Sequence, residues 1–446
     1  MMGLMPREET RTMTPPTVRS AAAHDAGKEG GASTRAWTMR LLVLGIVLAA
    51  LNLRPAITSL GALLEEVRDG LGMSGSVAGL LTSVPPLCFA VFGVMAPRLA
   101  RRFGAGAVVC AGMAAIATGL LVRPYAGGTA GFLAGSALAL MGIAVSNVLM
   151  PVIVKHWFPD RVGSMTGLYS MALALGTALA AAVTVPLTDT LGGSWQTGLA
   201  LWAGLAVAAV LPWLPFVRGR ATPPGAGDKA AAPQTQGPAS TSTEHARVEA
   251  PRLRMARSRT AWALAVFFGL QATAAYITMG WMAQIFRDAG VPAGTAGLLL
   301  AVTMVMGVPL AFVIPRVATR LPHQGPIVLA LGVCGLAGYA GLYLAPAAGA
   351  WAWALLLGVA NCAFPLALTL VGMRARTGPG VAQLSAFAQS TGYLISIPGP
   401  LLVGVLYQHS GGWGLPIALM SALMIPQMAV GFLAGRDRTV EDEAAR

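Results

Sequence analysis

The stretch LLVLGIVLAALNLRPAITSLGALL runs from Leu41 to Leu64 and carries one charged residue, Arg54. It is longer than the roughly 20 apolar residues that a helix needs to cross a hydrocarbon core about 30 Å thick, so it predicts a membrane span. At about 1.5 Å per residue, Arg54 lies roughly 21 Å from Arg40 and 16 Å from Glu65, which mark the two edges. We therefore expect Arg54 near the middle of the membrane.

A charge at this depth costs at least about 2.5–3.5 kcal/mol, so it is expected to face a cavity and to serve a function. Its planar, permanently charged fork suits a small anion or a flat polar molecule. On an ideal helix Arg54 shares a small or polar face with Val47, Ala50, Thr58 and Gly61. The alternatives are a structural clamp on backbone carbonyls and snorkelling towards the membrane surface.

The composition of the whole chain agrees with a membrane protein. Of 446 residues, 55% are hydrophobic and 11% charged, with a mean hydropathy of +0.67, whereas soluble proteins carry about 25% charged residues. The net charge of +13 comes from short basic clusters without interleaved aromatic residues, which argues against nucleic-acid binding. The cysteines show no disulfide or metal spacing and are expected to be small core residues.

Twelve apolar runs follow one another, six on each side of a polar linker. They lie at about 38–64, 76–97, 105–122, 129–154, 164–188, 195–217, 260–286, 294–315, 325–345, 350–372, 381–406 and 414–434. The predicted organisation is a disordered N-terminal tail (1–37), a six-helix bundle (38–217), a flexible linker (218–259), a second bundle (260–434) and a C-terminal tail (435–446). The linker is rich in Pro, Gly, Ser and Thr and cannot bury a core.

The distribution of basic residues supports this count. With a cytoplasmic N-terminus, 26 of the 30 Arg and Lys residues fall in cytoplasmic tails and loops, as the positive-inside rule requires. Arg68, Arg123 and Arg287 fall outside, and Arg54 alone is left within a span. We therefore predict a multi-pass protein of the inner (cytoplasmic) membrane with both termini in the cytoplasm.

The two halves contain repeated segments. AGLL at 78–81 recurs at 296–299, and PRLARR at 97–102 recurs as PRVATR at 315–320, both at an offset of 218 residues. The pair Asn147-x-x-x-Pro151 and Asn361-x-x-x-Pro365 recurs at an offset of 214. Paired halves of this kind describe the major facilitator fold, whose substrate site lies near the midplane between them. The predicted fold is an all-α membrane protein with twelve helices in two pseudo-symmetric six-helix bundles.

Particular strings resemble one branch of that superfamily. They are LNLRPAITSLG at 51–61, AGLLTSVPPLCF and APRLARRFG within 78–104, SNVLMPVIVKHWFPDRVGSMTGLYSMALALG at 146–176, and SAFAQSTGYLISIPGP at 385–400. Together they resemble the cyanate and 2-nitroimidazole permease family (CynX/NimT). The resemblance spans roughly 40–435. It implies a secondary transporter for small polar or anionic molecules, although the members differ in substrate.

The loops after the second and eighth runs resemble the superfamily signature GxLaDRxGRR, with Pro97 in place of the first Gly and Arg101 in place of Asp. Without the Asp, the usual charge-relay gate is in doubt. These arginines are predicted to brace the cytoplasmic helix ends as gating residues, and the alternative is positive-inside anchoring alone. The predicted set is Arg98, Arg101, Arg102, Arg316 and Arg320.

The repeated Asn-x-x-x-Pro segments are candidate substrate contacts. Pro151 and Pro365 lack the N–H that would bond the carbonyls of Asn147 and Asn361. Each asparagine therefore offers a free backbone acceptor beside its side-chain amide. The alternative is a kink that neighbouring helices satisfy.

Two further runs supply polar candidates. Gln271 and Tyr276 lie in the seventh run with Trp281, which is expected as an anchor at the membrane interface. In the eleventh run Ser385, Gln389, Tyr393 and Ser396 form one polar stripe, which lines the cavity or bonds another helix. Tyr169, at the start of the fifth run, is a further candidate. The predicted substrate-binding set is Arg54, Thr58, Asn147, Gln271, Tyr276, Asn361, Gln389 and Tyr393.

The apolar runs contain no Asp, Glu or His in their middle parts. Proton-coupled transporters commonly use such residues, so proton coupling would have to run through Arg54 and the substrate. No phosphate-binding loop and no catalytic constellation is present. We therefore expect neither an ATP-driven pump nor an enzyme, and no metal or cofactor.

The predicted function is transport of a small polar or anionic solute, such as a cyanate-like anion or a nitroimidazole-like heteroaromatic, by alternating access around Arg54. The expected partners are this solute, the bilayer and, if the transport is coupled, H⁺; the protein is expected to be a monomer. One alternative is an exporter of drugs or metabolites, which the lack of Pro between Gly167 and Gly176 disfavours. Another is a membrane receptor or scaffold that signals through the 218–259 linker.

Overall fold

The computed structural model describes residues 37–218 and 255–444, and all regular elements within these ranges are helices. Twelve of its helical spans are long and apolar enough to cross a membrane, which confirms the predicted fold class. The predicted N-terminal tail up to residue 36 and the linker from 219 to 254 lie outside the described residues. The chain divides into two compact units, Met1–Leu44 and Gly45–Arg446, and the packing described below is that of the second.

The helices of the first half begin with the span Trp37–Ala62, whose last part is α2. They are α2 (Pro55–Ala62), α3 (Leu64–Leu71), α4 (Gly75–Phe103), α5 (Ala105–Val122), α6 (Thr129–Trp157), α7 (Val162–Thr190), α8 (Trp195–Val210) and α9 (Pro215–Arg218). The short 3-10 turns are η1 (Arg123–Tyr125), η2 (Pro159–Arg161) and η3 (Leu211–Trp213).

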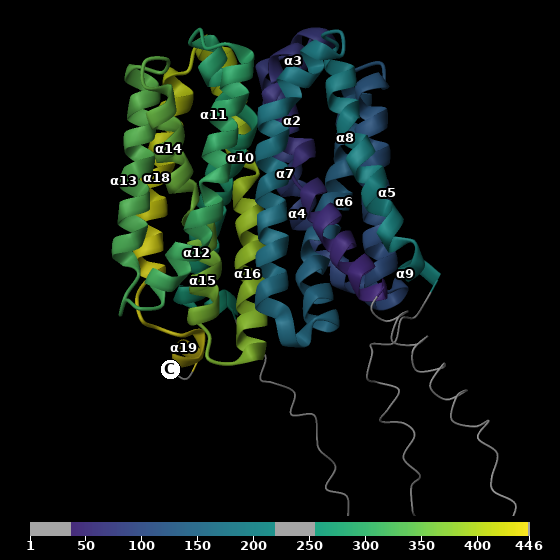
Figure 1. Cartoon of the computed structure of the whole chain (residues 1–446). Coiled ribbons are helices and arrows are strands. Elements are labelled where there is room, and N and C mark those ends of the chain that lie inside the picture. Colours follow the sequence, from purple (N-terminus) through teal and green to yellow (C-terminus); the bar gives the residue numbers. More distant parts are fainter. Residues whose placement is uncertain (1–36, 219–254, 445–446) are drawn as a thin grey trace, which may run out of the picture. The chain divides into compact units, whose positions relative to one another are not determined.

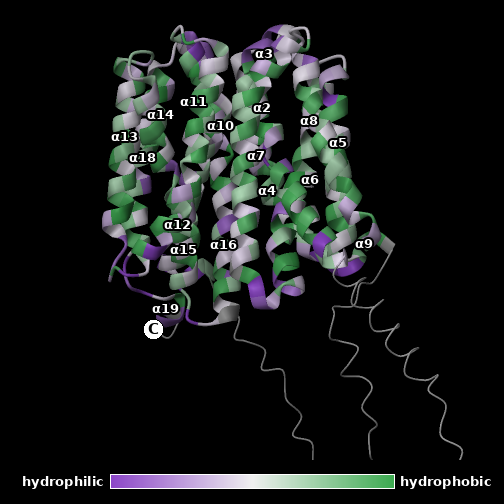
Figure 2. Ribbon diagram, in the orientation of Figure 1, coloured by the Kyte–Doolittle hydropathy of each residue, from purple (hydrophilic) through white to green (hydrophobic). Residues whose placement is uncertain are grey.

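The second half follows a 3-10 turn, η4 (Met255–Arg257). Its helices are α10 (Arg259–Asp288), α11 (Ala293–Val305), α12 (Gly307–Ala318), α13 (Gly325–Leu344), α14 (Ala350–Asn361), α15 (Ala363–Met373), α16 (Gly378–Ser396), α17 (Pro398–Ser410), α18 (Gly414–Ala434) and α19 (Val440–Ala444). In Figure 1 the first-half helices, purple to teal, lie together beside the green to yellow second half. Figure 2 shows hydrophobic residues along the spans and hydrophilic residues gathered near their ends.

Four spans are broken into two helices, and a proline follows each break. The breaks lie at Leu53–Arg54, Met306, Cys362 and Ile397. Proline removes the N–H that would continue the hydrogen-bond ladder and clashes with the preceding turn, as Pro55, Pro309, Pro365 and Pro398 do here. In contrast, α6 passes through Pro151 without interruption, so the repeated Asn-x-x-x-Pro segment breaks only the second-half helix.

The two halves meet through glycines at the end of the spans where α3 lies. A Cβ on Gly61 of α2 would stand 2.0 Å from the backbone oxygen of Met279 in α10. A Cβ on Gly297 of α11 would stand 2.5 Å from the backbone oxygen of Ala181 in α7. Real side chains do not reach such distances, so only glycine lets these backbones approach. Small residues serve the same purpose in other membrane helix pairs.

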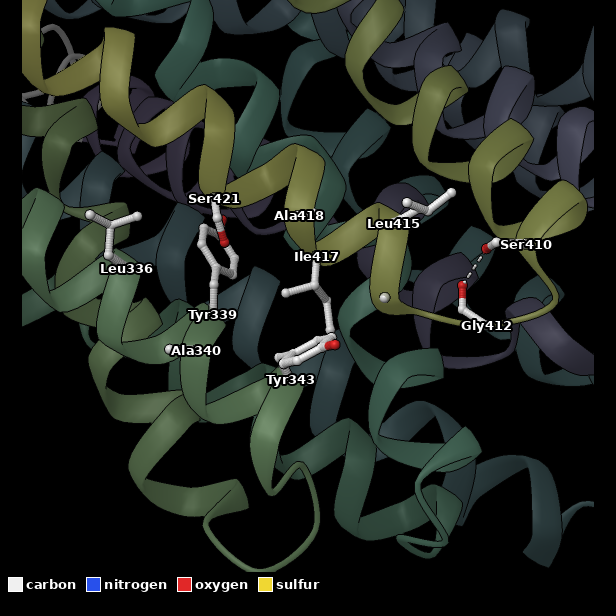
Figure 3. Close-up of a pocket in the computed structure, with 11 residues that line it drawn as sticks. Leu336, Tyr339, Ala340, Tyr343, Ser410, Gly412, Leu415, Ile417, Ala418 and Ser421 are labelled. Atoms are coloured by element: carbon white, nitrogen blue, oxygen red, sulfur yellow. Dashed lines mark hydrogen bonds between the residues drawn. The ribbon is translucent and has the colours of Figure 1, made fainter.

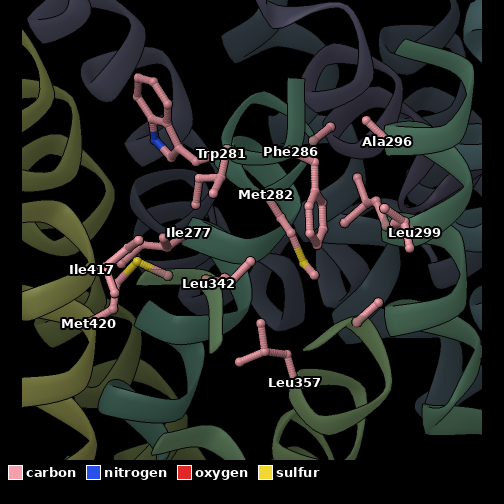
Figure 4. Packing of buried hydrophobic residues seen from close by; sticks show 14 of the residues in the cluster. Ile277, Trp281, Met282, Phe286, Ala296, Leu299, Leu342, Leu357, Ile417 and Met420 are labelled. Atoms are coloured by element: carbon pink, nitrogen blue, oxygen red, sulfur yellow. The ribbon is translucent and has the colours of Figure 1, made fainter. Parts of the chain in front are cut away.

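A hydrophobic cluster joins the halves in this region. It combines Leu64, Ala78 and Ala181 of the first half with residues of α10, α11, α13, α14, α17 and α18. Figure 4 shows Trp281, Phe286 and Leu299 within it. The indole of Trp281 is 0% exposed and donates a 3.2 Å hydrogen bond to the Thr82 hydroxyl. The expectation that Trp281 anchors the membrane interface is therefore wrong, because the indole is used to seal the two halves together.

Charged residues lie just beyond this cluster. The Arg287 guanidinium of α10 contacts the carboxylates of Glu65 and Glu66 in α3, each at 2.9 Å. Asp288 accepts hydrogen bonds of 2.8 Å from the Tyr407 hydroxyl and the Trp413 indole. Arg287 is 15% exposed, so this ion pair across the halves is partly shielded from solvent.

The opposite end is braced by α19, and two of its three carboxylates cap other helices. Glu443 accepts hydrogen bonds from the Ser258 and Thr260 hydroxyls and from the Thr260 N–H, at the start of α10. Glu441 accepts from the Arg376 and Thr377 N–H groups, at the start of α16. A negative charge is favoured at a helix N-terminus. These contacts hold α19 against the starts of α10 and α16.

These caps predict a loss of α19 docking in acid. Burial raises the pKa of both glutamates, but the hydrogen bonds outweigh it and hold each pKa below the ordinary 4.5. The stabilisation is therefore complete above about pH 4.5 and is lost as the pH falls through the lower folded-state value. Glu443→Gln should reproduce this loss at neutral pH. Hydrogen exchange of α19 and of the first turn of α10 should then rise, while exchange in α13 should stay unchanged; equal protection in wild type and variant would contradict the capping role.

Candidate functional site

A cavity of about 260 Å³ lies between the two halves. Its walls come from the first span, α7, α10, α11, α12, α14, α15 and α16. Three of the four helix breaks border it, through Arg54, Gly307 and Cys362. Discontinuous helices of this kind form the binding sites of many transporters, because a break presents backbone groups and helix ends to the solute.

Arg54 lines this cavity, as the sequence predicts. It stands at the break of the first span and is the residue that precedes α2. The first span is therefore not one ideal helix, since Pro55 ends the ladder there. Pro55 also leaves the Leu51 carbonyl without its helical donor, and α7 approaches this oxygen so closely that a Cβ on Gly176 would stand 2.2 Å from it.

The Arg54 charge acts on three tyrosine side chains. Tyr276, 3% exposed, is a side-chain hydrogen-bond partner of Arg54, and the charge also acts on the Tyr169 and Tyr393 hydroxyls. Tyr276 and Tyr393 line the cavity. No ion pair within residues 37–218 and 255–444 involves Arg54. The described site therefore offers hydrogen-bond donors and a positive charge without a carboxylate to neutralise it.

Gln271 and Asn361 are brought together at the second break. The Gln271 amide nitrogen donates to the Asn361 backbone oxygen at 2.8 Å, and it lies 3.3 Å from the Asn361 side-chain oxygen. This backbone oxygen is the acceptor that Pro365 leaves free. Both residues line the cavity, so the freed carbonyl accepts its hydrogen bond from a residue that also faces the cavity.

We expect Pro365→Ala to weaken solute binding without unfolding the protein. The new N–H can bond the Asn361 oxygen and compete with Gln271, so the second break should partly close. The loss of one hydrogen-bond arrangement is worth about 1 kcal/mol, or roughly fivefold in affinity. Titration of a transported solute into the purified variant measures this. Pro426→Ala in α18, away from the cavity, is the matched control, and an unchanged affinity in Pro365→Ala would contradict the role of the break.

The other predicted binding residues lie outside the cavity wall. The Asn147 side chain accepts a hydrogen bond from Tyr169 at 2.5 Å. Thr58 is 0% exposed and its hydroxyl bonds the Arg54 carbonyl at 3.3 Å. Gln389 donates to Ser385 in its own helix at 2.7 Å. Among the described residues these three therefore support the tyrosines, the break and α16, respectively, and do not line the cavity.

A second arginine supports the helix that carries Arg54. Arg123 is 2% exposed, within the span Ala105–Tyr125, and donates to the Ala56 carbonyl at 3.1 Å. Its guanidinium also lies 5.6 Å from the centre of the Phe132 ring. The distribution of basic residues predicts that Arg123 lies in an outer loop. The structure instead uses it to hold the first turn of α2, directly after Arg54.

The five predicted gating arginines are exposed and form no ion pair in the described part of the chain. Arg316 donates to the Phe312 carbonyl of its own helix at 3.2 Å. The buried arginine at this end is Arg374, which the sequence pattern did not single out. It is 2% exposed and donates to the carbonyls of Ala434 and Gly435, each at 2.9 Å.

A larger hollow, about 780 Å³, lies between α13 and α18 of the second half. Figure 3 shows Leu336, Tyr339, Tyr343 and Ile417 along it. No charged residue lines it, and Tyr343 is 63% exposed. This hollow borders only helices of the second half. It therefore faces the side where lipid is expected, and it does not belong to a path between the two halves.

The chain is similar to known transport proteins over most of its length. The family model described as Major Facilitator Superfamily matches residues 42–381. "Uncharacterized transporter YycB" of Bacillus subtilis (strain 168) is 37% identical over 90% of this chain and 94% of that protein. Two proteins of Escherichia coli (strain K12) are each 30% identical. The 2-nitroimidazole transporter is matched over 90% of this chain and 96% of its own, and the cyanate transport protein CynX over 87% and 96%.

Solved structures show the same fold at low sequence identity. The inward-facing, occupied structure of a bacterial homologue of the human lysosomal transporter Spinster has a TM-score of 0.69 at 14% identity, over 88% of this chain and 96% of that one. The D-xylose–proton symporter has a TM-score of 0.67 at 14% identity, over 90% and 99%.

Proposed function

Because the chain belongs to the Major Facilitator Superfamily and is a membrane transporter rather than an enzyme, we propose that it carries a small polar or anionic solute by alternating access. The solute is held in the central cavity against Arg54. Its relatives include a cyanate transport protein and a 2-nitroimidazole transporter, and both names describe small solutes.

One observation carries this proposal. The Arg54 guanidinium, which has no ion-pair partner in the described part of the chain, stands at a helix break in a cavity whose walls come from both halves. A charge inside a membrane protein is expensive and usually marks a substrate pathway. Arg54 is therefore where a solute acceptor group would bind, and rocking of the halves would expose this site to each side in turn.

The end of the spans that holds Arg287, Glu65 and Glu66 is proposed as the outer gate. The basic-residue distribution supports an orientation with this end outside and both termini in the cytoplasm of the inner membrane. Glycine contacts, the hydrophobic cluster and the ion pair join the halves there. The described conformation is accordingly the one in which the outer gate is shut.

Reconstituted protein tests the proposal. Labelled cyanate, 2-nitroimidazole and other small anions are offered to proteoliposomes, with protein-free vesicles as the control. Saturable uptake that Arg54→Ala removes supports the proposal, and flux that is indifferent to Arg54 refutes it. Preloaded vesicles compare export with import, and an imposed pH gradient measures coupling to H⁺. Deletion of residues 222–250 should leave flux intact, because the cavity lies wholly outside the linker.

A further inference from the structure

The backbone at Arg54 lies outside the regular hydrogen-bond ladder of the first span. The span breaks at Leu53–Arg54, because Pro55 has no N–H to continue the ladder. Arg54 is half-buried, and its carbonyl accepts hydrogen bonds from the N–H groups of Ile57 and Thr58 at 2.9 and 3.2 Å. The backbone of Arg54 therefore follows α2, and the contacts that hold α2 also set the position of the guanidinium.

Asn52 fixes the chain on one side of this break. It is 1% exposed, and its side-chain amide donates to the Leu48 carbonyl at 2.8 Å and to the Leu205 carbonyl of α8 at 3.1 Å. The first bond closes the last turn before the break, and the second ties this turn to another helix of the same half. Both N–H groups of the amide are thus used.

Arg123 fixes the chain on the other side of the break. Its guanidinium donates to the Ala56 carbonyl, in the first turn of α2, at 3.1 Å and lies against the Phe132 ring. The contacts of Asn52 and Arg123 all lie within the first half. Arg54 is therefore held in a defined place relative to the first-half bundle from both directions along the chain.

Stability alone does not account for an arginine at position 123. The side chain is 2% exposed, and its Nε and Nη2 atoms have no hydrogen-bond partner among the described residues. Replacing a buried, poorly paired charge by an apolar side chain of similar size is often neutral or stabilising. The Ala56 carbonyl would still face the N–H of Leu60, its partner in the α2 ladder. The contact with α2 thus indicates a role in function.

Resting on the proposed function, we infer that Asn52 and Arg123 are positioning residues for transport. They hold the two sides of the break in the first span, so that the Arg54 guanidinium is in place before the solute arrives. A preorganised group loses less freedom when it binds, and it therefore binds more tightly. Neither positioning residue lines the cavity, so both act on the solute through Arg54.

Two variants test this inference, with cyanate and 2-nitroimidazole as the probes. Arg123→Met and Asn52→Leu remove the polar contacts and largely keep the side-chain volume. Each should raise the dissociation constant of a probe that requires Arg54 by about three- to tenfold, the loss expected when a fixed side chain becomes mobile. In Arg123→Met, hydrogen exchange at Ile57 and Thr58 should rise about fivefold, because one hydrogen bond to α2 is lost.

The thermal unfolding midpoint separates positioning from a structural role. It should not fall in Arg123→Met, since this variant removes a buried charge without an ion-pair partner among the described residues. If Arg123→Met does not fold, Arg123→Gln replaces it, with the same expected changes in binding and exchange.

Arg374→Met is the matched control. Arg374 is also 2% exposed and donates to backbone carbonyls, but it lies in the second half, at the end where α19 docks. Its guanidinium has several partners, including Asp437. The control variant should therefore lower the unfolding midpoint, because these contacts are lost, and leave the dissociation constants unchanged.

The outcomes also distinguish this inference from the proposed function. If Arg123→Met or Asn52→Leu leaves the dissociation constants unchanged, the inference is overturned for that residue, whatever happens to stability. It is overturned for both if Arg374→Met weakens binding as much as they do. The proposed transport site stands in these cases as long as binding requires Arg54. If neither probe requires Arg54 for binding or flux, the proposed function fails and the inference fails with it.

Discussion

Arg54→Ala is expected to abolish transport and to leave the folded protein at least as stable as the wild type. Transport should fall by about 100-fold or more, because two charge-assisted hydrogen bonds to the solute, each worth about 1.5–3 kcal/mol, are lost. Stability should not fall, because the variant removes a half-buried charge that has no ion-pair partner within residues 37–218 and 255–444. Flux in proteoliposomes and the thermal unfolding midpoint measure the two effects separately.

Arg54→Lys refines this prediction. The lysine keeps the charge but presents a point charge on a flexible stem instead of a planar fork. If a bidentate contact is required, most of the transport should still be lost. Arg436→Ala is the matched control, because Arg436 is an exposed arginine in the C-terminal tail. Uptake at the wild-type level by Arg54→Ala would rule out the site.

Gly61→Val is expected to stop transport by keeping the halves apart. A Cβ at this position would stand 2.0 Å from the Met279 oxygen, and a backbone oxygen cannot swing away as a flexible side chain can. Overpacking of this kind costs about 1–3 kcal/mol or more, which shifts a two-state equilibrium by about 5- to 150-fold. The described conformation should therefore become rare, and solute taken up from outside should not be released inside.

Thiol labelling reports the conformational shift directly. Thr82 lies between the halves and is 6% exposed, so Thr82→Cys should react slowly with a membrane-impermeant maleimide added from outside. Adding Gly61→Val should accelerate this reaction at least about fivefold. Gly204→Val is the matched control, since a Cβ on Gly204 meets no atom within 4 Å. Normal flux and slow labelling in Gly61→Val would show that the glycine contact is not needed for closure.

Much of the architecture could be predicted because the bilayer imposes simple rules. Length and hydropathy give twelve spans, and a lone Arg54 in the first of them indicates a cavity. Pro55 and Pro365 also indicate where backbone groups are freed. Pro309 also indicates a freed backbone group, since it follows the break at Met306. No polar residue stands beside it in the sequence, so the pattern did not indicate that this segment lines the cavity.

Some residues were assigned the wrong place from the sequence, because their positions depend on packing against other helices. Arg123 is near a span end in the sequence, yet Gly135 leaves room for it against α6, and it turns inward to Ala56. Pro151 and Pro365 occur in the same motif, but only the second lies beside a break. Gln389 and Tyr393 share one polar stripe, and only Tyr393 reaches the cavity. Such differences arise from the neighbouring helices and not from the segment itself.

The glycine contacts between the halves also bear on how fast the proposed outer gate can open. Where large side chains interlock, separation requires them to change rotamer and withdraw from one another through crowded intermediates. At Gly61 and Gly297 one backbone rests directly against another, so the surfaces can part as rigid bodies. The activation barrier should then come mainly from hydration of the Arg287 ion pair and exposure of the hydrophobic cluster. The opening rate of such a gate would be set by its solvent more than by the internal motion of its side chains.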